Sequence, residues 1–524
     1  MDEHRKIAKA ATVVGGATLL SRIFGFIRDM VVAQFFGAGM ATDAFFVAFR
    51  IPNLLRRLVG EGALTASFIP VYTEYITQRS KAESDELVNA AFSILAVLLI
   101  LVTALGILFS PWIVKVLAYG FFQEPEKFRL TVLLNRLMFP YIFFIGLVAL
   151  AMGVLNTWNR FAAPALAPVL LNLSIIACAL FFSDMLQEPI LSLAIGVILG
   201  GVAQLFFQIP FMQRINIVPR LRFNLSHPGV KRIGILMAPS VLGLAVTQLN
   251  VIVSTFLASY LPEGSVSYLY YADRLLEFPM GIFAIAIATA VLPTLSEYSA
   301  KNDLEKLKET ISFALRLVFF VTLPAMVGLI ALRLPILNLL FQRGAFTAHS
   351  TEMTAQALLY YALGLAAFAG VRIVVPAFYS LQDTKTPVKV AFIALLANAG
   401  LGALLMIPLR HGGLAFATSL AAGLNFALLV ILLRRRLGKI GASKIIRSFL
   451  RNLGASLAMG AVALAICSGG PWQTTGVTAE KIWLLLGAIL AGILVYGGSC
   501  YLFGSQELHS AMEIIKKKMG RGNR

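Results

Sequence analysis

The stretch LVNAAFSILAVLLILVTALGILF (87–109) runs for 23 residues without an Asp, Glu, Lys or Arg. Crossing the ~30 Å hydrocarbon core of a bilayer takes roughly 20 apolar residues in a helix, so this stretch predicts a transmembrane helix. The whole chain shares this character, since 59% of its 524 residues are hydrophobic and 13% are charged. Soluble domains have roughly 45–50% and 25%, so the composition predicts an integral membrane protein and excludes a soluble globule, a disordered chain and a disulfide scaffold.

Fourteen apolar stretches of sufficient length follow one another along the chain, each bounded by charges, Pro or Gly. The fold class we expect is therefore an all-α polytopic membrane protein. The N-terminal stretch is interrupted by Arg22, Arg28 and Asp29, so we interpret it as a retained helix rather than a cleaved signal peptide. The predicted spans are 12–36, 41–75, 87–117, 130–156, 163–183, 189–212, 231–260, 266–297, 310–341, 352–380, 387–408, 413–434, 447–468 and 482–503.

The basic residues predict the orientation of these spans. The chain has 44 Lys and Arg against 25 Asp and Glu, a net charge of +19. With a cytoplasmic N-terminus, 28 of the 44 lie in cytoplasmic segments, 11 within spans and only Lys127, Arg129, Arg343, Arg410 and Lys481 outside. This bias predicts cytoplasmic N- and C-termini, and it places basic loops opposite anionic membrane lipids. Nucleic acid is not expected as a partner.

An internal repeat divides the chain into two related halves. A shift of 223 residues lays ALTASFIPVYTEY (63–75) over AIATAVLPTLSEY (286–298) and Pro164 over Pro387; a shift of 224 lays Pro111 over Pro335. Each half then holds six spans, and two further helices follow, a 6+6+2 arrangement with domains 1–225, 226–440 and 441–524. Two pseudo-symmetric six-helix bundles around a central site are typical of alternating-access transporters.

Charged residues within the predicted spans are the candidates for function, because a charge at the bilayer centre costs at least about 2.5–3.5 kcal/mol. The acids number five against eleven basic residues, so the excess of six positive charges predicts an anionic substrate. Ten of the eleven are Arg, which binds phosphate or carboxylate through two parallel hydrogen bonds. The basic residues are Arg22, Arg28, Arg50, Arg56, Arg57, Lys115, Arg136, Arg274, Arg316, Arg333 and Arg372, and the acids are Asp29, Asp43, Glu61, Asp273 and Glu277.

Position along the helices separates these charges into groups. Asp43, Arg50, Arg57 and Glu61 follow one stripe of the second span, which we expect Pro52 to break locally. Arg50 and Arg57 are either structural partners of Asp43 and Glu61 or part of the site. Lys115, Arg136 and Arg333 lie near span ends and are expected to reach the interface, while Arg316 and Arg372 stay open. With few acids nearby, Arg22, Arg28, Arg56 and Arg274 are the expected substrate-binding residues.

Enzymatic chemistry has no signature in the chain. There is no GxxxxGK[ST] or HExxH motif, and Cys178, Cys467 and Cys500 lie apart in apolar surroundings, so no metal site or cofactor is predicted. Transport would then draw on a Na⁺ or H⁺ gradient or on the membrane potential. Asp383 is a weak candidate for ion coupling, and a helix cap is the alternative interpretation of the same residue.

Several long segments resemble the MurJ (MviN) family, the bacterial lipid II flippases of the multidrug/oligosaccharidyl-lipid/polysaccharide exporter superfamily. The resemblance covers essentially the whole chain. It rests on SRIFGFIRD (21–29), FGAGMATDAFFVAFRIPNLLRRLVGEGALTASFIPVYTEY (36–75), LNTWNRF (155–161), GSVSYLYYADRLLEFPMGI (264–282) and FYSLQDTKTPVK (378–389).

The resemblance implies a transporter of the bacterial cytoplasmic membrane that serves peptidoglycan biosynthesis. By motif, the essential arginines of the family fall on Arg22, Arg28, Arg56 and Arg274, and its polar partners fall on Asp29, Asp43 and Glu61. The implied substrate is lipid II, with its pyrophosphate in a cationic cavity and its undecaprenyl tail in the lipid. Peptidoglycan synthases are candidate partners. The alternative is an ion-coupled exporter of drugs or of another polyprenyl-linked saccharide in the same superfamily.

Overall fold

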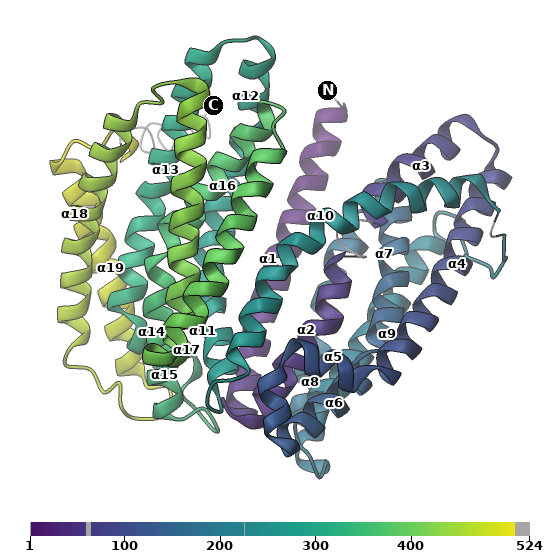
Figure 1. Ribbon diagram of the computed structural model, residues 1–524, viewed down its shortest axis with the longest axis horizontal. Helices are drawn as coiled ribbons and strands as arrows, with labels where there is room; N and C mark the ends of the chain where they lie inside the picture. The colour runs from purple at the N-terminus through teal and green to yellow at the C-terminus, as the bar shows by residue number, and fades with distance from the viewer. Residues whose placement is uncertain (1, 59–63, 225, 509–524) are drawn as a thin grey trace. The chain divides into compact units, whose positions relative to one another are not determined.

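The computed structural model describes residues 2–58, 64–224 and 226–508, and within them every regular element is a helix (Figure 1). The predicted all-α class is confirmed. The chain forms two compact units, Met1–Ser267 (unit 1) and Tyr268–Arg524 (unit 2). The predicted boundary at 225/226 marks a sequence repeat rather than a division in packing, and it stays a prediction.

Unit 1 consists of ten helices and the first residues of an eleventh. Local sequence signals explain several of their ends. Ser80 and Glu83 form a reciprocal capping box at the start of α4, and Pro125 and Pro228 occupy the first positions of α6 and α10. The helices are α1 (Asp2–Phe36), α2 (Met40–Leu58), α3 (Leu64–Gln78), α4 (Lys81–Leu108), α5 (Ser110–Leu117), α6 (Pro125–Met138), α7 (Tyr141–Thr157), α8 (Ala162–Phe182), α9 (Leu191–Gln213) and α10 (Pro228–Ala258).

The second predicted span corresponds to two helices, α2 and α3, and one expectation about it was wrong. Pro52 does not break α2, because the helix continues through it to Leu58. Its ring has no N–H to donate, but a helix tolerates that loss when the surrounding turns are packed, and Pro52 is buried. Residues 59–63, which include Glu61, lie outside the described part of the chain.

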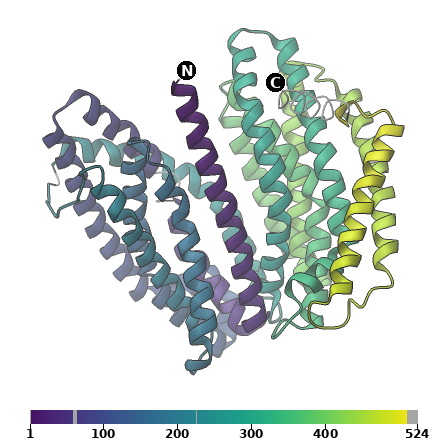
Figure 2. The same cartoon turned by 180° about the vertical axis from the view of Figure 1, so that it is seen from behind.

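Unit 2 contains the remaining helices; at one side of it α18 packs along α13, and α19 packs along α18 (Figures 1 and 2). A π-helical segment, Met280–Ala284, joins α11 to α12. The helices are α11 (Ser265–Pro279, shared with unit 1), α12 (Ile285–Ala300), α13 (Leu304–Ala331), α14 (Arg333–Phe341), α15 (Ala348–Leu363), α16 (Leu365–Ser380), α17 (Lys385–Leu437), α18 (Ala442–Cys467) and α19 (Ala479–Leu502).

α17 is a hairpin of two helices rather than one straight rod. Arg410 has φ 50° and ψ −131°, which no helix accommodates. A Cβ on Gly413 would lie 2.1 Å from the Leu405 carbonyl oxygen, although eight residues of straight helix span about 12 Å. The chain therefore reverses between the predicted spans 387–408 and 413–434, and only glycine fits at position 413.

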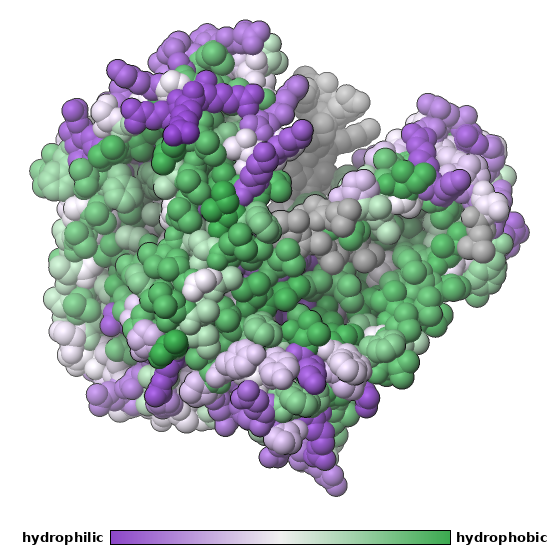
Figure 3. All heavy atoms as spheres, viewed as in Figure 1, coloured by the Kyte–Doolittle hydropathy of each residue, from purple (hydrophilic) through white to green (hydrophobic). Residues whose placement is uncertain are grey.

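Several helices have the length and composition of membrane spans. Among the described residues, eight segments are long and apolar enough, and the bent pair α15 and α16 gives up to nine. The surface of each unit carries a hydrophobic band between two polar ends, as expected for a protein in a bilayer (Figure 3). Each of the fourteen predicted stretches falls on one of these helices, on part of α17 or on an adjacent pair. The fourteen-span layout and the side of the termini stay predictions.

The repeated prolines occupy equivalent places in the two units. Pro164 and Pro387 are both the third residue of their helices, α8 and α17, while Pro70 and Pro293 both lie inside short helices, α3 and α12. Each unit also has its own apolar core, built around Phe68 and Tyr72 in unit 1 and around Phe319 in unit 2.

The α17 hairpin gives a first prediction. Replacing Gly413 with Ala should lower the free energy of unfolding by about 1–3 kcal/mol, because the added methyl group collides with backbone rather than with a movable side chain. Gly423→Ala is the matched control, since nothing lies within 4 Å of a Cβ at that position of the same element. Thermal unfolding in detergent compares the two variants. Equal midpoints would contradict the hairpin.

Candidate functional site

Arg28 and Asp29 form a buried charged pair on α1. The Arg28 side chain donates from Nη2 to Asp29 Oδ1 at 2.6 Å and from Nε to the same oxygen at 3.1 Å. Neighbouring helical residues do not normally face each other, so the long guanidinium folds back along the helix to meet the short carboxylate. Arg28 is 8% exposed and Asp29 3% exposed. The expectation that Arg28 has too few acids nearby is wrong.

Asn172 of α8 completes this group and was not predicted. Its Oδ1 accepts from Arg28 Nη1 at 3.1 Å, and its Nδ2 donates to the Ser21 carbonyl oxygen at 3.2 Å. The amide therefore ties α8 to α1 and fixes the orientation of the Arg28 guanidinium. One asparagine in an apolar helix, AAPALAPVLLNLSIIACALFF, was the only sequence signal for this role.

Arg22 lies on the same helix in different surroundings. It is exposed, and within the described part of the chain its guanidinium makes no hydrogen bond or ion pair with a protein group. Asp29, on the same helix, is buried. The two arginines of SRIFGFIRD thus differ, one held in place and one accessible.

Asp43 forms the second buried charge cluster, and its ion-pair partner is Lys127 rather than Arg50, for which a structural pairing with Asp43 was one of two interpretations. Asp43 Oδ2 lies 3.2 Å from Lys127 Nζ, and both side chains are 1% exposed. Lys127 also lies over the Phe121 ring, 4.2 Å from its centroid. The sequence predicts Lys127 in a loop on the outer side of the membrane, whereas the residue is buried in α6. A helix brings it to Asp43 because α6 packs against α2.

The same carboxylate caps α11. Asp43 Oδ2 accepts from the Gly264 N–H at 2.8 Å, and Oδ1 accepts from the N–H and the hydroxyl of Ser267 at 2.9 and 2.7 Å. A negative charge at a helix N-terminus is favourable, since the first N–H groups have no partner within the helix. Asp43 therefore joins α2, α6 and the start of α11.

The other arginines of α2 lie in different surroundings. Arg50 donates from Nη1 to the Thr255 hydroxyl of α10, and Arg56 donates from Nε to Asn53 Oδ1 at 3.0 Å. Arg57 is exposed. The predicted stripe is thus distributed over different environments, with Asp43 buried and Arg50 half-buried, and Glu61 lies outside the described residues.

Arg274 lies in unit 2 with an aromatic and an acidic neighbour. Its Nη2 donates to the Tyr270 hydroxyl at 3.0 Å, and its Nη1 pairs with Glu277 Oε2 at 2.8 Å. The Arg274 guanidinium lies 5.0 Å from the Tyr270 ring centroid. Its side chain is 31% exposed and Asp273 beside it is exposed, so this group is held loosely compared with Arg28.

Arg316, which the sequence left open, has a structural partner. It pairs with Glu507 at 2.8 Å, and Glu507 also accepts from the hydroxyls of Ser448 and Ser505. The cluster ties α13 to α18 and to the segment after α19. Arg333 donates to the Ile330 carbonyl oxygen, and Lys115 lies 4.2 Å from the Phe122 ring centroid. Arg136 and Arg372 are exposed.

Asp383 has the geometry of a helix cap. Its Oδ1 accepts from the Thr386 N–H at 3.0 Å and its Oδ2 accepts from the Thr386 hydroxyl at 2.7 Å. These hydrogen bonds lower the pKa of the Asp383 carboxyl below its ordinary value, and Arg436 pairs with it at 2.9 Å. Within the described residues no group of three His, Cys, Asp or Glu side chains could hold a metal ion.

Buried charge pairs inside apolar helices of this length are typical of polytopic membrane transporters. Comparison with known proteins gives the family. The family model described as "Lipid II flippase MurJ" matches residues 32–487. A probable lipid II flippase MurJ of Vibrio cholerae is 39% identical over 95% of this chain and 97% of its own length, and a lipid II flippase MurJ of Burkholderia cenocepacia is 38% identical over 95% and 97%. The chain belongs to the lipid II flippase MurJ family.

Solved structures agree with this assignment. A lipid II flippase MurJ in an inward closed conformation superposes with a TM-score of 0.78 and 29% identity, covering 96% of this chain and all of that one. An inward-facing multidrug resistance transporter of the MATE family gives a TM-score of 0.64 at 16% identity over 82% of this chain and 98% of its own, a likeness of fold alone. The resemblance drawn from the sequence is confirmed: the protein is a transporter of the bacterial cytoplasmic membrane rather than an enzyme.

The Asp43 cluster generates a prediction about stability. Asp43→Ala should cost about 3–5 kcal/mol, since it leaves Lys127 charged and buried without its partner and removes the cap of α11. The double variant Asp43→Asn, Lys127→Met should recover much of this loss. Thermal unfolding of Asp43→Asn, Lys127→Met and the double variant forms a double-mutant cycle; a coupling energy near zero would show that the pair does not act as a unit.

Asp383 gives a prediction that separates its two interpretations. As a cap, Asp383→Ala should cost about 1 kcal/mol while Asp383→Asn, which keeps the accepting oxygen, costs little. Because the folded-state pKa is lowered, the contribution of the charge is present at neutral pH and is lost as the pH falls through that lowered value. Thermal midpoints measured from pH 7 down to pH 2 check this, because pH 4 still lies above the lowered value. An equal loss of ion-dependent transport in both variants would instead assign Asp383 to coupling.

Proposed function

We propose that this protein moves lipid II from the inner to the outer leaflet of the cytoplasmic membrane. The observation that carries the proposal is the relationship, over nearly the full length, to proteins named lipid II flippase. Lipid II combines an undecaprenyl chain with a pyrophosphate, sugars and a peptide. A carrier therefore has to shelter a large polar, anionic head from hydrocarbon while the chain stays in lipid.

The arginines supply the chemistry that such a head requires. We assign Arg22, Arg28 and Arg56 of unit 1 and Arg274 of unit 2 to the pyrophosphate, because guanidinium groups bind phosphate oxygens in pairs and stay charged in a partly dry site. Asp29 and Asn172 position Arg28 for this task. Asp43, Arg50, Arg57, Glu61, Asp273 and Glu277 are assigned as the polar surroundings of the site.

The transport cycle we propose is alternating access by two related six-helix bundles. The layout is 6+6+2, with fourteen spans, both termini cytoplasmic and domains at 1–225, 226–440 and 441–524. The equivalent prolines of the two units support a duplication. Rearrangement of the bundles would expose the headgroup first to the cytoplasm and then to the outside.

The energy source is a separate part of the proposal. A Na⁺ or H⁺ gradient or the membrane potential drives the cycle, and no resident cofactor is required. The seventh predicted span, now α10, offers Gln248 and Asn250 but no carboxylate, so neutral oxygens would have to contribute to any ion site there. Anionic membrane lipids and peptidoglycan synthases are the further partners that we propose.

Arginine replacement tests the assignment. Arg28→Ala and Arg274→Ala should each lower lipid II translocation by about 10–100-fold, because a hydrogen bond to a charged group contributes roughly 1.5–3 kcal/mol. Arg→Lys should recover only part, since Lys binds phosphate as a point charge. Proteoliposomes with labelled lipid II measure the rate, and thermal unfolding verifies the fold.

Arg136→Ala is the matched control, because Arg136 is exposed and has no role in the proposed site. Its translocation rate should equal that of the wild type. Full activity of both Arg28→Ala and Arg274→Ala in correctly folded protein would overturn the pyrophosphate assignment.

A further inference from the structure

The segment 214–224, between α9 and α10, lies along the first turns of α4. The Arg220 N–H donates to Asn89 Oδ1 and the Arg222 N–H donates to Ser93 Oγ, both at 2.7 Å. Two residues of extended chain span about 6.6 Å and four residues of helix about 6 Å, so the two spacings match. Backbone N–H groups of alternate residues in the segment are therefore bonded to side chains of α4.

Apolar side chains of this segment are exposed at the level where α4 becomes apolar. Val218 is 55% exposed, and Leu221 and Phe223 are each 66% exposed. The apolar run of α4 begins at Leu87, and Ser93 lies six residues, or about 9 Å, further along the helix. Interfacial elements bury their apolar side chains ~5–10 Å into the boundary between headgroups and acyl chains. The exposed residues thus lie at the depth of a membrane interface.

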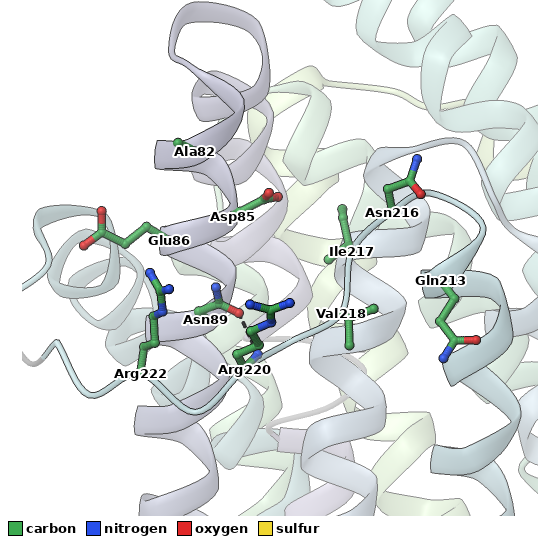
Figure 4. Close-up of a pocket in the computed structure, with 10 residues that line it drawn as sticks. All are labelled: Ala82, Asp85, Glu86, Asn89, Gln213, Asn216, Ile217, Val218, Arg220 and Arg222. Atoms are coloured by element: carbon green, nitrogen blue, oxygen red, sulfur yellow. Dashed lines mark hydrogen bonds between the residues drawn. The ribbon is translucent and has the colours of Figure 1, made fainter.

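A polar cavity of about 500 Å³ opens beside these residues (Figure 4). Arg220 and Arg222 line it from the segment, and both point toward the N-terminal turns of α4 (Figure 4). Asp85 and Glu86 line it from α4. Within the described residues neither guanidinium forms an ion pair with a carboxylate, and Glu86 accepts from Asn224 Nδ2 at 3.1 Å. The cavity therefore presents two cationic and two anionic groups to a ligand.

We propose that this cavity binds the headgroup of a phospholipid that carries a phosphate and a primary ammonium. The phosphate would be bound by Arg220 and Arg222, and the ammonium would donate to Asp85 and Glu86. A headgroup that carries only negative charge would be repelled by the two carboxylates, because it has no cation to pair with them. A quaternary ammonium would bind less well than a primary one, because it has no N–H to donate to them. Val218, Leu221 and Phe223 supply the adjacent contact with acyl chains.

The bound lipid would also stabilise the start of α10, which follows the segment directly. Arg232 of α10 pairs with Glu74 of α3 at 2.7 Å, and a Cβ on Gly229 would lie 2.8 Å from the Leu87 side chain. The first turns of α10 therefore rest on α3 and α4, and α4 also lines the cavity. This lipid is distinct from the transported substrate, so the proposal stands apart from the function proposed above.

Lipid retention tests the proposal directly. The full chain, purified and stripped of lipid in detergent, is titrated with phosphatidylethanolamine, phosphatidylglycerol and phosphatidylcholine of identical acyl chains, and native mass spectrometry counts the bound molecules. The wild type should retain the ethanolamine lipid at least about fivefold better than the other two. Arg220→Ala with Arg222→Ala should remove this retention, whereas Asp85→Asn with Glu86→Gln should weaken the preference over both other lipids, because it removes the carboxylates that accept from the ammonium.

Controls separate the cavity from general basic attraction. Arg214→Gln removes a charge from the same segment but not from the cavity, and it should leave the preference intact. Soluble phosphoethanolamine should fail to compete, since it lacks acyl chains. A photoreactive ethanolamine lipid should label residues 82–93 and 213–222 of the wild-type chain. This experiment tests the proposal even if a variant misfolds, because it uses no variant. Equal retention of all three lipids, or labelling elsewhere, would overturn the proposal.

Discussion

A charge inside a bilayer has to be paired, solvated or bound by a ligand, and this constraint organises the whole chain. Removing either partner of a buried pair leaves the other charged in a poor solvent, at a cost of about 3–5 kcal/mol. Among the described residues, the buried pairs that meet this constraint include Arg28 with Asp29, Lys127 with Asp43, and Arg316 with Glu507. Each of these pairs also joins helices or positions a side chain.

The pairs differ in what they do for the fold. Asp43 is almost fully enclosed, and it holds two helices and caps a third, so its role is structural. Arg28 is fixed by Asp29 and by an amide from α8, an arrangement that orients a guanidinium without neutralising the basic excess of the spans. Arg22, one and a half turns away, is exposed. A fixed cation beside accessible ones suits a site that binds a phosphate group and then releases it.

Much of the fold could be predicted from the sequence because apolar length is a local property. The stretch at 87–109, the duplicated prolines and the two spans within α17 needed no knowledge of packing. The partner of each charged residue, by contrast, could not be identified without knowledge of packing. Lys127 looks like a loop residue because it follows Pro125 and Glu126, and only the packing of α6 on α2 buries it against Asp43. Asn172 and Glu507 lie 144 and 191 residues from the arginines they contact, so no local pattern in the sequence identifies either as a partner.

The candidate arginines were predicted for a reason that is only partly correct. They were selected because few acids surround them in the sequence, yet Arg28 and Arg274 each bond a carboxylate on their own helix. The excess of basic over acidic residues in the spans does not depend on that reason, and Arg22 and Arg57 are exposed. The break expected at Pro52 is absent from α2, because neighbouring helices can support a turn that lacks one backbone hydrogen bond.

The leaflet distribution of lipid II after depletion of this protein in living cells measures the proposed function most directly. Lipid II should accumulate in the inner leaflet and become inaccessible to a probe added outside the membrane, and re-expression of the wild-type chain should restore its accessibility. Lipid II that stays equally accessible from outside throughout depletion would contradict the proposal that this protein carries it across.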